Sequence, residues 1–310
     1  MSRIHEALKK AEQERASMTA AEVAPLLVDP SAAATARGGN VSGATAAVAR
    51  PAAASPLSSG YLRFDDLRTH CAHPQWHLDP NANVFYSPDA HIHGAEQFRT
   101  LRSRIYQLRG AQPLRTLLVT SAIPAEGKTF LANNLAQAIV RQPDRRALVI
   151  DADLRLPRMH LALGAPLFPG LTDYLRGEAD EISVIQHGQE GNLCFIPGGN
   201  EVSDPSELLS NGRFKTLLER VTPVFDWVII DSPPCLPVAD ASILADLCDG
   251  VLIVVRAGST PSETAQRACQ EFRERNLIGV VLNRAEEPAG YGGESYHYGY
   301  AQAYAKIPQK

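Results

Sequence analysis

The stretch that decides the fold runs from Leu114 to Thr129 and reads LRTLLVTSAIPAEGKT. Its apolar residues Leu117 to Val119 predict a short buried strand, because small and turn-forming residues bound them. Helical spacing of apolar residues then continues to Val140. A strand, a tight loop ending in Gly-Lys-Thr and a helix together form a cradle for phosphate groups, in which backbone N–H groups and the helix N-terminus face the anion.

The Gly-Lys-Thr triplet assigns chemical roles to its side chains. In such a loop Lys128 reaches the β- and γ-phosphates of a nucleotide, and the Thr129 hydroxyl binds Mg²⁺. The pattern departs from the usual G-x-x-x-x-G-K-[ST], because Ala122 stands where the first glycine belongs. Ala125 also stands where glycine is common, and its Cβ is expected to be tolerated near phosphates only if its φ stays negative. The candidate nucleotide-binding residues of the loop are Ala125, Glu126, Gly127, Lys128, Thr129 and Phe130.

Further apolar runs alternate with helical segments along the chain. This alternation indicates an α/β fold with a mostly parallel sheet and helices on both faces. In such a sheet, ligands bind outside the carboxyl ends of the strands. The runs at 146–151 and 225–231 both end in aspartate, so their carboxylates are expected at that edge. The remaining expected strands are 250–255 and 278–283, and the expected helices lie around 204–222, 239–247 and 261–275.

Three aspartates at two strand ends complete the candidate active site. Asp151 and Asp153 follow one strand, and Asp231 follows the next. A single aspartate in this position often caps the following helix, but three of them beside a Gly-Lys-Thr loop favour a nucleotide site. Mg²⁺ takes one or two carboxylates in such sites, which suits Asp153 and Asp231. Phosphoryl transfer also needs a fixed positive charge, supplied by Lys128, and an acceptor for the proton of the attacking hydroxyl, which leaves Asp151.

Composition restricts the class of protein. With 310 residues, 45% of them hydrophobic, the chain is long enough for one large domain or two. A formal net charge of −4 gives no reason to expect nucleic-acid binding. The sequence has neither a run of about 18 apolar residues nor the apolar core of a signal peptide. Its five cysteines lack C-x-x-C spacing, which indicates reduced thiols and a cytoplasmic location.

The first 90 residues give little indication of a packed structure. Residues 3–15 are amphipathic, typical of a solvated helix or of a helix that docks on a partner or a membrane surface. Residues 17–60 are rich in Ala, Ser, Pro and Gly and lack aromatic residues, which predicts disorder. We therefore expect a short helix at 1–16 and a largely disordered linker at 17–90. Histidines in this region could ligate zinc together with Cys71, although their spacing fits no standard ligand pattern. They are His70, His73, His77, His91 and His93.

A second helical pattern begins near Ala95, with an apolar stripe on one face. Beside the stripe, Glu96, Arg99 and Arg102 fall three residues apart. A solvated face with an internal ion pair is the default interpretation of such charges. The alternative is a seam of ion pairs between subunits.

The C-terminal segment concentrates tyrosines. Five of the nine in the chain lie within residues 291–304, among Gly, Ala, Ser and Gln. A disordered aromatic tail is one interpretation. Beside a phosphoryl-transfer site, a substrate segment with several acceptor hydroxyls is the better one. The candidate acceptors are Tyr291, Tyr296, Tyr298, Tyr300 and Tyr304.

Five features in the same order resemble the bacterial tyrosine kinases (BY-kinases), the P-loop autokinases of capsule and exopolysaccharide synthesis. The family's Walker A motif, Ser-x-x-Pro-x-x-Gly-Lys-Thr, is matched at 121–129. Its second motif, three aliphatic residues and then Asp-x-Asp-x-Arg, is matched at 148–155, and its Walker B motif, aliphatic residues and then Asp-x-Pro-Pro, at 228–234. The family also has a Glu-x-x-Arg-x-x-Arg helix for ring assembly, matched at 96–102, and a C-terminal tyrosine cluster.

The resemblance implies a P-loop NTPase fold of the deviant Walker, MinD-like type, with a kinase domain at 91–288 and a tyrosine-rich tail at 289–310. It implies ATP and Mg²⁺ as cofactors, trans-autophosphorylation of the tail within a homo-oligomeric ring, and reversal by a tyrosine phosphatase. A membrane-embedded polysaccharide co-polymerase would activate the cytoplasmic chain and recruit it to the inner face of the membrane. The resemblance also favours the intersubunit seam at Glu96, Arg99 and Arg102, and suggests that Asn283 lies near the adenine.

Two other functions share parts of this pattern. A positioning ATPase of the ParA/MinD type has the same fold and acidic motifs, but carries a second lysine early in the loop, where this chain has Ile123. A nucleotide-binding regulatory scaffold would not need a complete catalytic set. The presence of Lys128 and all three aspartates, together with the tyrosine tail, favours the kinase.

Overall fold

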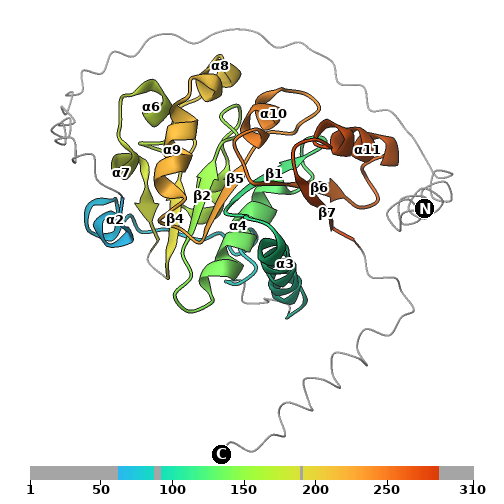
Figure 1. Ribbon diagram of the computed structural model, residues 1–310. Coiled ribbons are helices and arrows are strands. Elements are labelled where there is room, and N and C mark those ends of the chain that lie inside the picture. Colours follow the sequence, from blue (N-terminus) through green and yellow to red (C-terminus); the bar gives the residue numbers. More distant parts are fainter. Residues whose placement is uncertain (1–61, 87–91, 189–190, 286–310) are drawn as a thin grey trace, which may run out of the picture.

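Seven strands form one sheet in the computed structural model, which describes residues 62–86, 92–188 and 191–285 (Figure 1). Their order across the sheet is β3-β4-β2-β5-β1-β6-β7, and every neighbouring pair is parallel except β3 with β4. The prediction of a mostly parallel α/β sheet is confirmed. The strands are β1 (Thr116–Ser121), β2 (Ala147–Asp151), β3 (Gln186–His187), β4 (Leu193–Ile196), β5 (Trp227–Asp231), β6 (Gly250–Arg256) and β7 (Leu277–Asn283).

Helices cover both faces of the sheet and bury an apolar core on each. On one face lie α3 (Ile92–Ala111), α4 (Lys128–Val140) and α5 (Met159–Leu163), packed on a cluster that includes Leu117 and Trp227. The central strands are buried on both faces, which is why they are continuous apolar runs. The helices on the other face are α2 (Phe64–His70), α6 (Leu171–Arg176), α7 (Glu181–Val184), α8 (Pro205–Ser210), α9 (Arg213–Val221), α10 (Asp240–Ala245) and α11 (Ser262–Glu271).

Strand register brings the acidic motifs together. In the parallel pair of β2 and β5, Asp151 lies directly opposite Asp231, and Val119 of β1 lies opposite Asp231 on its other side. Both aspartates therefore sit at the carboxyl edge of the sheet, beside the loop that joins β1 to α4. This edge is where a parallel sheet binds ligands.

Residues 72–86, here called the strap, run across the outside of α4 and are held there by buried amide side chains. Asn134 of α4 accepts a hydrogen bond from the Val84 amide at 2.9 Å and donates one to the Ala82 carbonyl at 2.9 Å. Asn83, which is fully buried, accepts hydrogen bonds from Asn133 and Gln137. The strap thus accepts hydrogen bonds from the side-chain amides of Asn133, Asn134 and Gln137, which lie on the face of α4 that it covers.

The expected linker at 17–90 is corrected for residues 62–86. Instead of disorder, the structure shows α2 and the strap, with Phe64 and Leu67 buried in the core and Trp76 packed against Phe195. The segment lacks a periodic apolar pattern because its few apolar residues are buried one at a time. Its backbone is held by amide side chains of α4 at Ala82 and Val84, and by backbone groups of residues 162–187 at Ala72, His77 and Asp79. All of these partners are distant along the chain.

Several predicted features lie outside the described residues. These are the helix at 1–16, the linker up to residue 61, His91 and the tyrosine-rich tail at 289–310. Within the described part of the chain, no three His, Cys, Asp or Glu side chains are grouped so that they could hold a metal ion, so the zinc interpretation gains no support there. No helix among these residues is long and apolar enough to cross a membrane.

Truncation of Leu67 tests whether α2 belongs to the folded unit. Leu67→Ala is expected to lower the free energy of unfolding by about 2–5 kcal/mol, because it leaves a cavity in a fully buried position. The control Arg68→Ala changes an exposed side chain of the same helix and is expected to stay within about 0.5 kcal/mol of the wild type. Urea denaturation measures the change in the free energy of unfolding for both variants. Equal, small changes would show that residues 62–70 do not belong to the folded unit.

Candidate nucleotide-binding site

The loop between β1 and α4 is shaped by close backbone contacts. Gly127 has a φ of 96°, and a Cβ at this position would lie 2.1 Å from the Asn283 side-chain nitrogen. That nitrogen donates to the Glu126 carbonyl at 2.8 Å. Only glycine combines this φ with this approach, so the glycine before Lys128 is required by the end of β7. Asn283, expected near the adenine, thus contacts the phosphate loop itself.

The Glu126 side chain braces the loop from within the protein. Its carboxylate is buried and accepts hydrogen bonds from the backbone amide of Ile123 at 2.8 Å, from the amide of Arg256 at 3.3 Å and from the Thr260 hydroxyl. One oxygen is engaged by Ile123 of the loop and the other by Arg256 and Thr260 on the β6 side, so neither oxygen is free for the phosphates. Any contact of Glu126 with a nucleotide would therefore use its backbone.

Ala125 departs from the expectation of a negative φ. Its φ is 65°, in the left-handed region that alanine enters at a cost of about 1–2 kcal/mol. A P-loop needs this backbone shape to turn its N–H groups inward, and the loop keeps it although the residue is not glycine. The strain is held by the surrounding contacts, including those of Glu126 and Gly127.

Phe130, also expected at the nucleotide, turns its ring away from the loop. The ring packs against Phe98 of α3, with centroids 5.9 Å apart, and joins the apolar cluster on that face. Its size is explained by this packing between α3 and α4. The side chain is partly buried against this cluster, and the backbone of Phe130 lies at the helix N-terminus.

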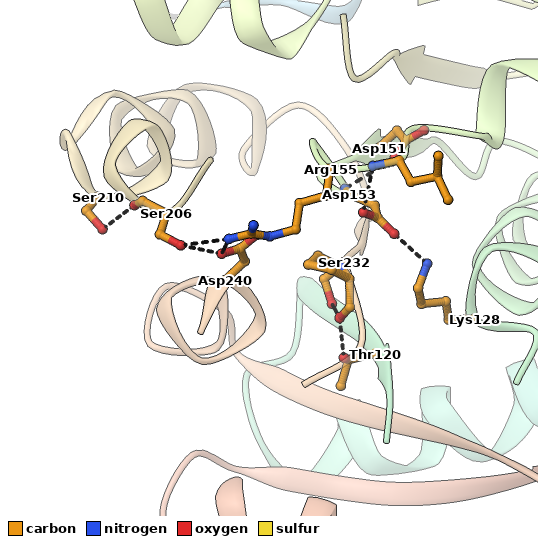
Figure 2. A network of polar contacts seen from close by, with 11 residues as sticks. Thr120, Lys128, Asp151, Asp153, Arg155, Ser206, Ser210, Ser232 and Asp240 are labelled. Carbon is orange, nitrogen blue, oxygen red and sulfur yellow. Dashed lines mark hydrogen bonds and ion pairs between the residues drawn. The ribbon is translucent and has the colours of Figure 1, made fainter. Parts of the chain in front are cut away.

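Lys128 lies beside Asp153 and Asp151 at the end of β2 (Figure 2). Asp231 ends the neighbouring strand β5 in register with Asp151, so all three carboxylates share this edge of the sheet. The Lys128 Nζ is 2.7 Å from Asp153 Oδ2, and the two side chains are 14% and 8% exposed. Burial alone would lower the pKa of Lys128, but the charges of Asp231 and Asp153 outweigh it, so the pKa is raised and the ammonium keeps its proton. The structure therefore brings together all four residues predicted as catalytic.

Asp151 is fully buried and holds the chain that follows it. One of its oxygens accepts from the Asp153 amide at 3.3 Å and the other from the Met159 amide at 3.0 Å. Burial, and next to it the charge of Asp231, raise the pKa of Asp151 well above the ordinary value. A hydroxyl could reach this carboxylate only if neighbouring groups moved, so its role as a proton acceptor stays a prediction.

Asp231 has the least satisfied side chain in the site. Both of its oxygens are buried and have no hydrogen-bond partner within the described part of the chain. The nearby Thr129 hydroxyl helps to lower the pKa without making a hydrogen bond of standard geometry. Burial dominates, however, and raises the pKa of Asp231 to about 6, against the lowering effect of Lys128. Bare buried carboxylate oxygens are costly, and a cation beside them would remove that cost.

These residues fit a magnesium nucleotide. Mg²⁺ keeps several waters and takes one or two carboxylates together with phosphate oxygens. Asp231, Asp153 and the Thr129 hydroxyl would hold it, and the ion would neutralise charge on the phosphates.

Comparison with known proteins leads to the same family as the sequence motifs. No protein-family model matches the chain. It is 34% identical over 203 residues to the tyrosine-protein kinase YwqD of Bacillus subtilis (strain 168), an alignment that covers 65% of this chain and 85% of the relative. It is 32% identical over 207 residues to the tyrosine-protein kinase CpsD of Streptococcus agalactiae, covering 66% and 89%. The solved kinase domain of Escherichia coli tyrosine kinase ETK matches with a TM-score of 0.58 and 34% identity, over 64% of this chain and 80% of that one.

The chain belongs to the bacterial tyrosine-protein kinases. Relatives in this family differ in length, since the matched residues of the Escherichia coli (strain K12) kinase etk make up 26% of that protein. The Walker A motif, the Asp-x-Asp-x-Arg motif, the Walker B motif and the Glu-x-x-Arg-x-x-Arg helix of this kinase all lie in the described part of the chain. Its candidate acceptor tyrosines lie outside that part.

The charged residues expected at the kinase's subunit seam form contacts within the chain. Arg99 pairs with Glu96 on the surface of α3 at 2.9 Å, which is the internal ion pair of the default interpretation. Arg102 instead turns to α4 and donates to the Ala138 carbonyl at 2.5 Å. Exposed pairs of this kind contribute little to stability and can exchange partners, so the seam remains a prediction.

Sequence reasoning missed several residues that organise this kinase site. Thr260 binds Glu126, and Asp240 pairs with Arg155, a member of the Asp-x-Asp-x-Arg motif to which no role was given. The hydroxyls of Thr120 and Ser232 fasten the strand ends by donating to the Pro233 and Val119 carbonyls. No spacing rule connects such residues, since their partners are far away along the chain.

Replacement of Ala125 by glycine tests the strain in the kinase's phosphate loop. Ala125→Gly is expected to raise the free energy of unfolding by up to about 1 kcal/mol, because glycine adopts a φ of 65° without steric cost. Ala122→Gly is the control: this buried alanine is not among the described residues with positive φ, so glycine there should destabilise. Thermal and urea unfolding measure both; a loss of stability in Ala125→Gly would contradict the assigned backbone.

Proposed function

We propose that the chain transfers the γ-phosphoryl group of Mg-ATP to tyrosine hydroxyls of its own C-terminal segment, one subunit acting on another. The observation that carries this proposal is the grouping of Lys128 with Asp153 and the unsatisfied Asp231 beside a P-loop, in a chain of the tyrosine-protein kinase family. Tyrosine acceptors are supplied by residues 291–304.

Each residue has a role that follows from its position. The Lys128 ammonium, which the carboxylates keep protonated, would contact the β- and γ-phosphates and balance the charge that develops during transfer. Asp153, Asp231 and Thr129 would hold Mg²⁺, which supplies charge neutralisation and aligns the phosphates when bound. Asp151, with its raised pKa, is the candidate acceptor of the tyrosine proton. Backbone N–H groups of residues 125–130 would line the phosphates, and Asn283 would fix the loop from the adenine side.

The cellular role is also a proposal. Phosphorylation of the tail would regulate capsule or exopolysaccharide synthesis and export, with a membrane polysaccharide co-polymerase as activator and a tyrosine phosphatase as antagonist. The chain would act as a cytoplasmic ring whose seam uses Glu96, Arg99 and Arg102. A ParA/MinD-type ATPase is less favoured, since Ile123 is partly buried against the core where those proteins carry a lysine.

Replacement of Lys128 tests the proposed reaction. Lys128→Met, purified from a host without tyrosine kinases, is expected to lose detectable phosphorylation of the tail after incubation with Mg-ATP, because the fixed positive charge at the phosphates is removed. Mass spectrometry of the peptides that contain Tyr291 to Tyr304 gives the readout. Lys215→Met, which changes an exposed lysine on α9, is the control and should behave as the wild type. Full phosphorylation of the Lys128 variant would refute the proposal.

A further inference from the structure

Arg155 makes a bidentate ion pair with Asp240, a residue much later in the chain (Figure 2). The Arg155 Nε donates to Asp240 Oδ2 at 2.8 Å and Nη2 donates to Oδ1 at 2.9 Å. A planar guanidinium that engages both oxygens of a carboxylate fixes direction as well as distance. The pair joins the turn after β2 to the start of α10.

Asp240 is itself held in place from a third element. Its side chain is 0% exposed, and the Ser206 hydroxyl of α8 donates to the same oxygen that Arg155 Nη2 contacts. Arg155 Nη2 also donates to that hydroxyl oxygen at 3.2 Å. The Asp240 carboxylate is therefore an anchored acceptor with its position set by α8 and α10.

The turn that carries Arg155 determines where the Asp153 carboxylate points. The Leu156 amide donates to the Asp153 carbonyl at 3.1 Å and to Asp153 Oδ1 at 3.2 Å. The other oxygen, Oδ2, accepts from Lys128 Nζ at 2.7 Å. Residues 153–156 thus form a closed turn with Asp153 at one end, and Arg155 is its anchored member.

Stability alone does not account for this pair. Arg155 is 38% exposed, so its charge remains largely solvated, whereas the Asp240 carboxylate has lost its water entirely. A pair of this kind contributes little net stability, and an apolar replacement is often neutral or better. Its location next to Asp153 gives it a geometric use instead.

We propose that Asp240 is a positioning residue of the phosphoryl-transfer site: through Arg155 it fixes the 153–156 turn and directs the Asp153 carboxylate toward Lys128 and the Mg²⁺ of the nucleotide. The inference rests on the proposed function for its effect on rate, but its effect on Mg²⁺-dependent nucleotide binding is separate from phosphorylation. The effect of Asp240 on the nucleotide is indirect and passes through Arg155 to the Asp153 carboxylate.

Calorimetric binding of ADP with and without Mg²⁺ gives the first test. In the wild type, Mg²⁺ should tighten ADP binding; in Asp240→Asn this tightening should shrink about 10-fold, while binding of ADP without Mg²⁺ stays within about 2-fold. The rate of tail phosphorylation should fall about 10–100-fold, the size expected for a small misplacement of a reacting group. Asn keeps the volume and removes the charge, so the fold is expected to survive.

A double-mutant cycle shows whether Asp240 acts through Arg155. Arg155→Met should show the same loss of Mg²⁺-dependent tightening, and Arg155→Met combined with Asp240→Asn should show no further loss. Glu181→Gln is the matched control. Glu181 of α7 pairs with Arg220 of α9 away from the site, and the Arg220 Nε donates to Glu181 Oε1 at 2.6 Å. The Glu181→Gln variant should leave the Mg²⁺ effect unchanged.

Two results would overturn the inference. One is an Asp240→Asn variant that melts at a lower temperature but keeps the wild-type Mg²⁺ effect, which would make the pair merely structural. The other is a double variant whose losses multiply, which would separate Asp240 from Arg155. If the wild type binds Mg-ADP but phosphorylates no tyrosine, the proposed function fails while the binding test of Asp240 still stands.

Discussion

The structure depends on the burial of three carboxylates beside a single lysine at the edge of a parallel sheet. Asp151, Asp153 and Asp231 are all buried, and Lys128 pairs directly with Asp153. Because folding raises the pKa of Asp231 to about 6, the folded state binds more protons than the unfolded state between about pH 4 and pH 6. The contribution of Asp231 to the free energy of unfolding therefore falls as pH rises through this window, and its ionised carboxylate costs stability at neutral pH.

Distant parts of the chain hold this unfavourable arrangement in place. The strap and α2 lie against α4 and the core on opposite faces, so residues before the P-loop help to fix the helix that begins at Lys128. Glu126 ties the loop to β6, and Asn283 ties it to the end of β7, from which the chain continues toward the tail. The phosphate loop is thereby linked to the segment that carries the proposed acceptors.

The sequence allowed prediction of the parts that follow from local pattern. Apolar runs that alternate with helical segments predicted the parallel sheet. The strand-end aspartates and the Gly-Lys-Thr loop predicted that Lys128 and Asp231 would meet, because carboxyl ends of parallel strands share one edge. Prediction failed where structure depends on contacts between distant residues. The strap has no periodicity and is fixed by Asn134, and the positive φ of Ala125 is imposed by the loop around it. No sequence pattern distinguishes Asp240 from other polar residues of a helix, and its pairing with Arg155 depends on tertiary structure.

The most direct test of the account is the number of protons released when Mg-ADP binds at pH 6. Calorimetry of preformed Mg-ADP in two buffers of different ionisation enthalpy measures it. Because burial raises the pKa of Asp231 to about 6, part of this carboxyl population carries a proton at pH 6 in the free protein, and a cation beside it should displace that proton. The account predicts a net release of protons on binding, which Asp231→Asn largely abolishes. Equal binding enthalpies in the two buffers, or an unchanged release in the variant, would contradict it.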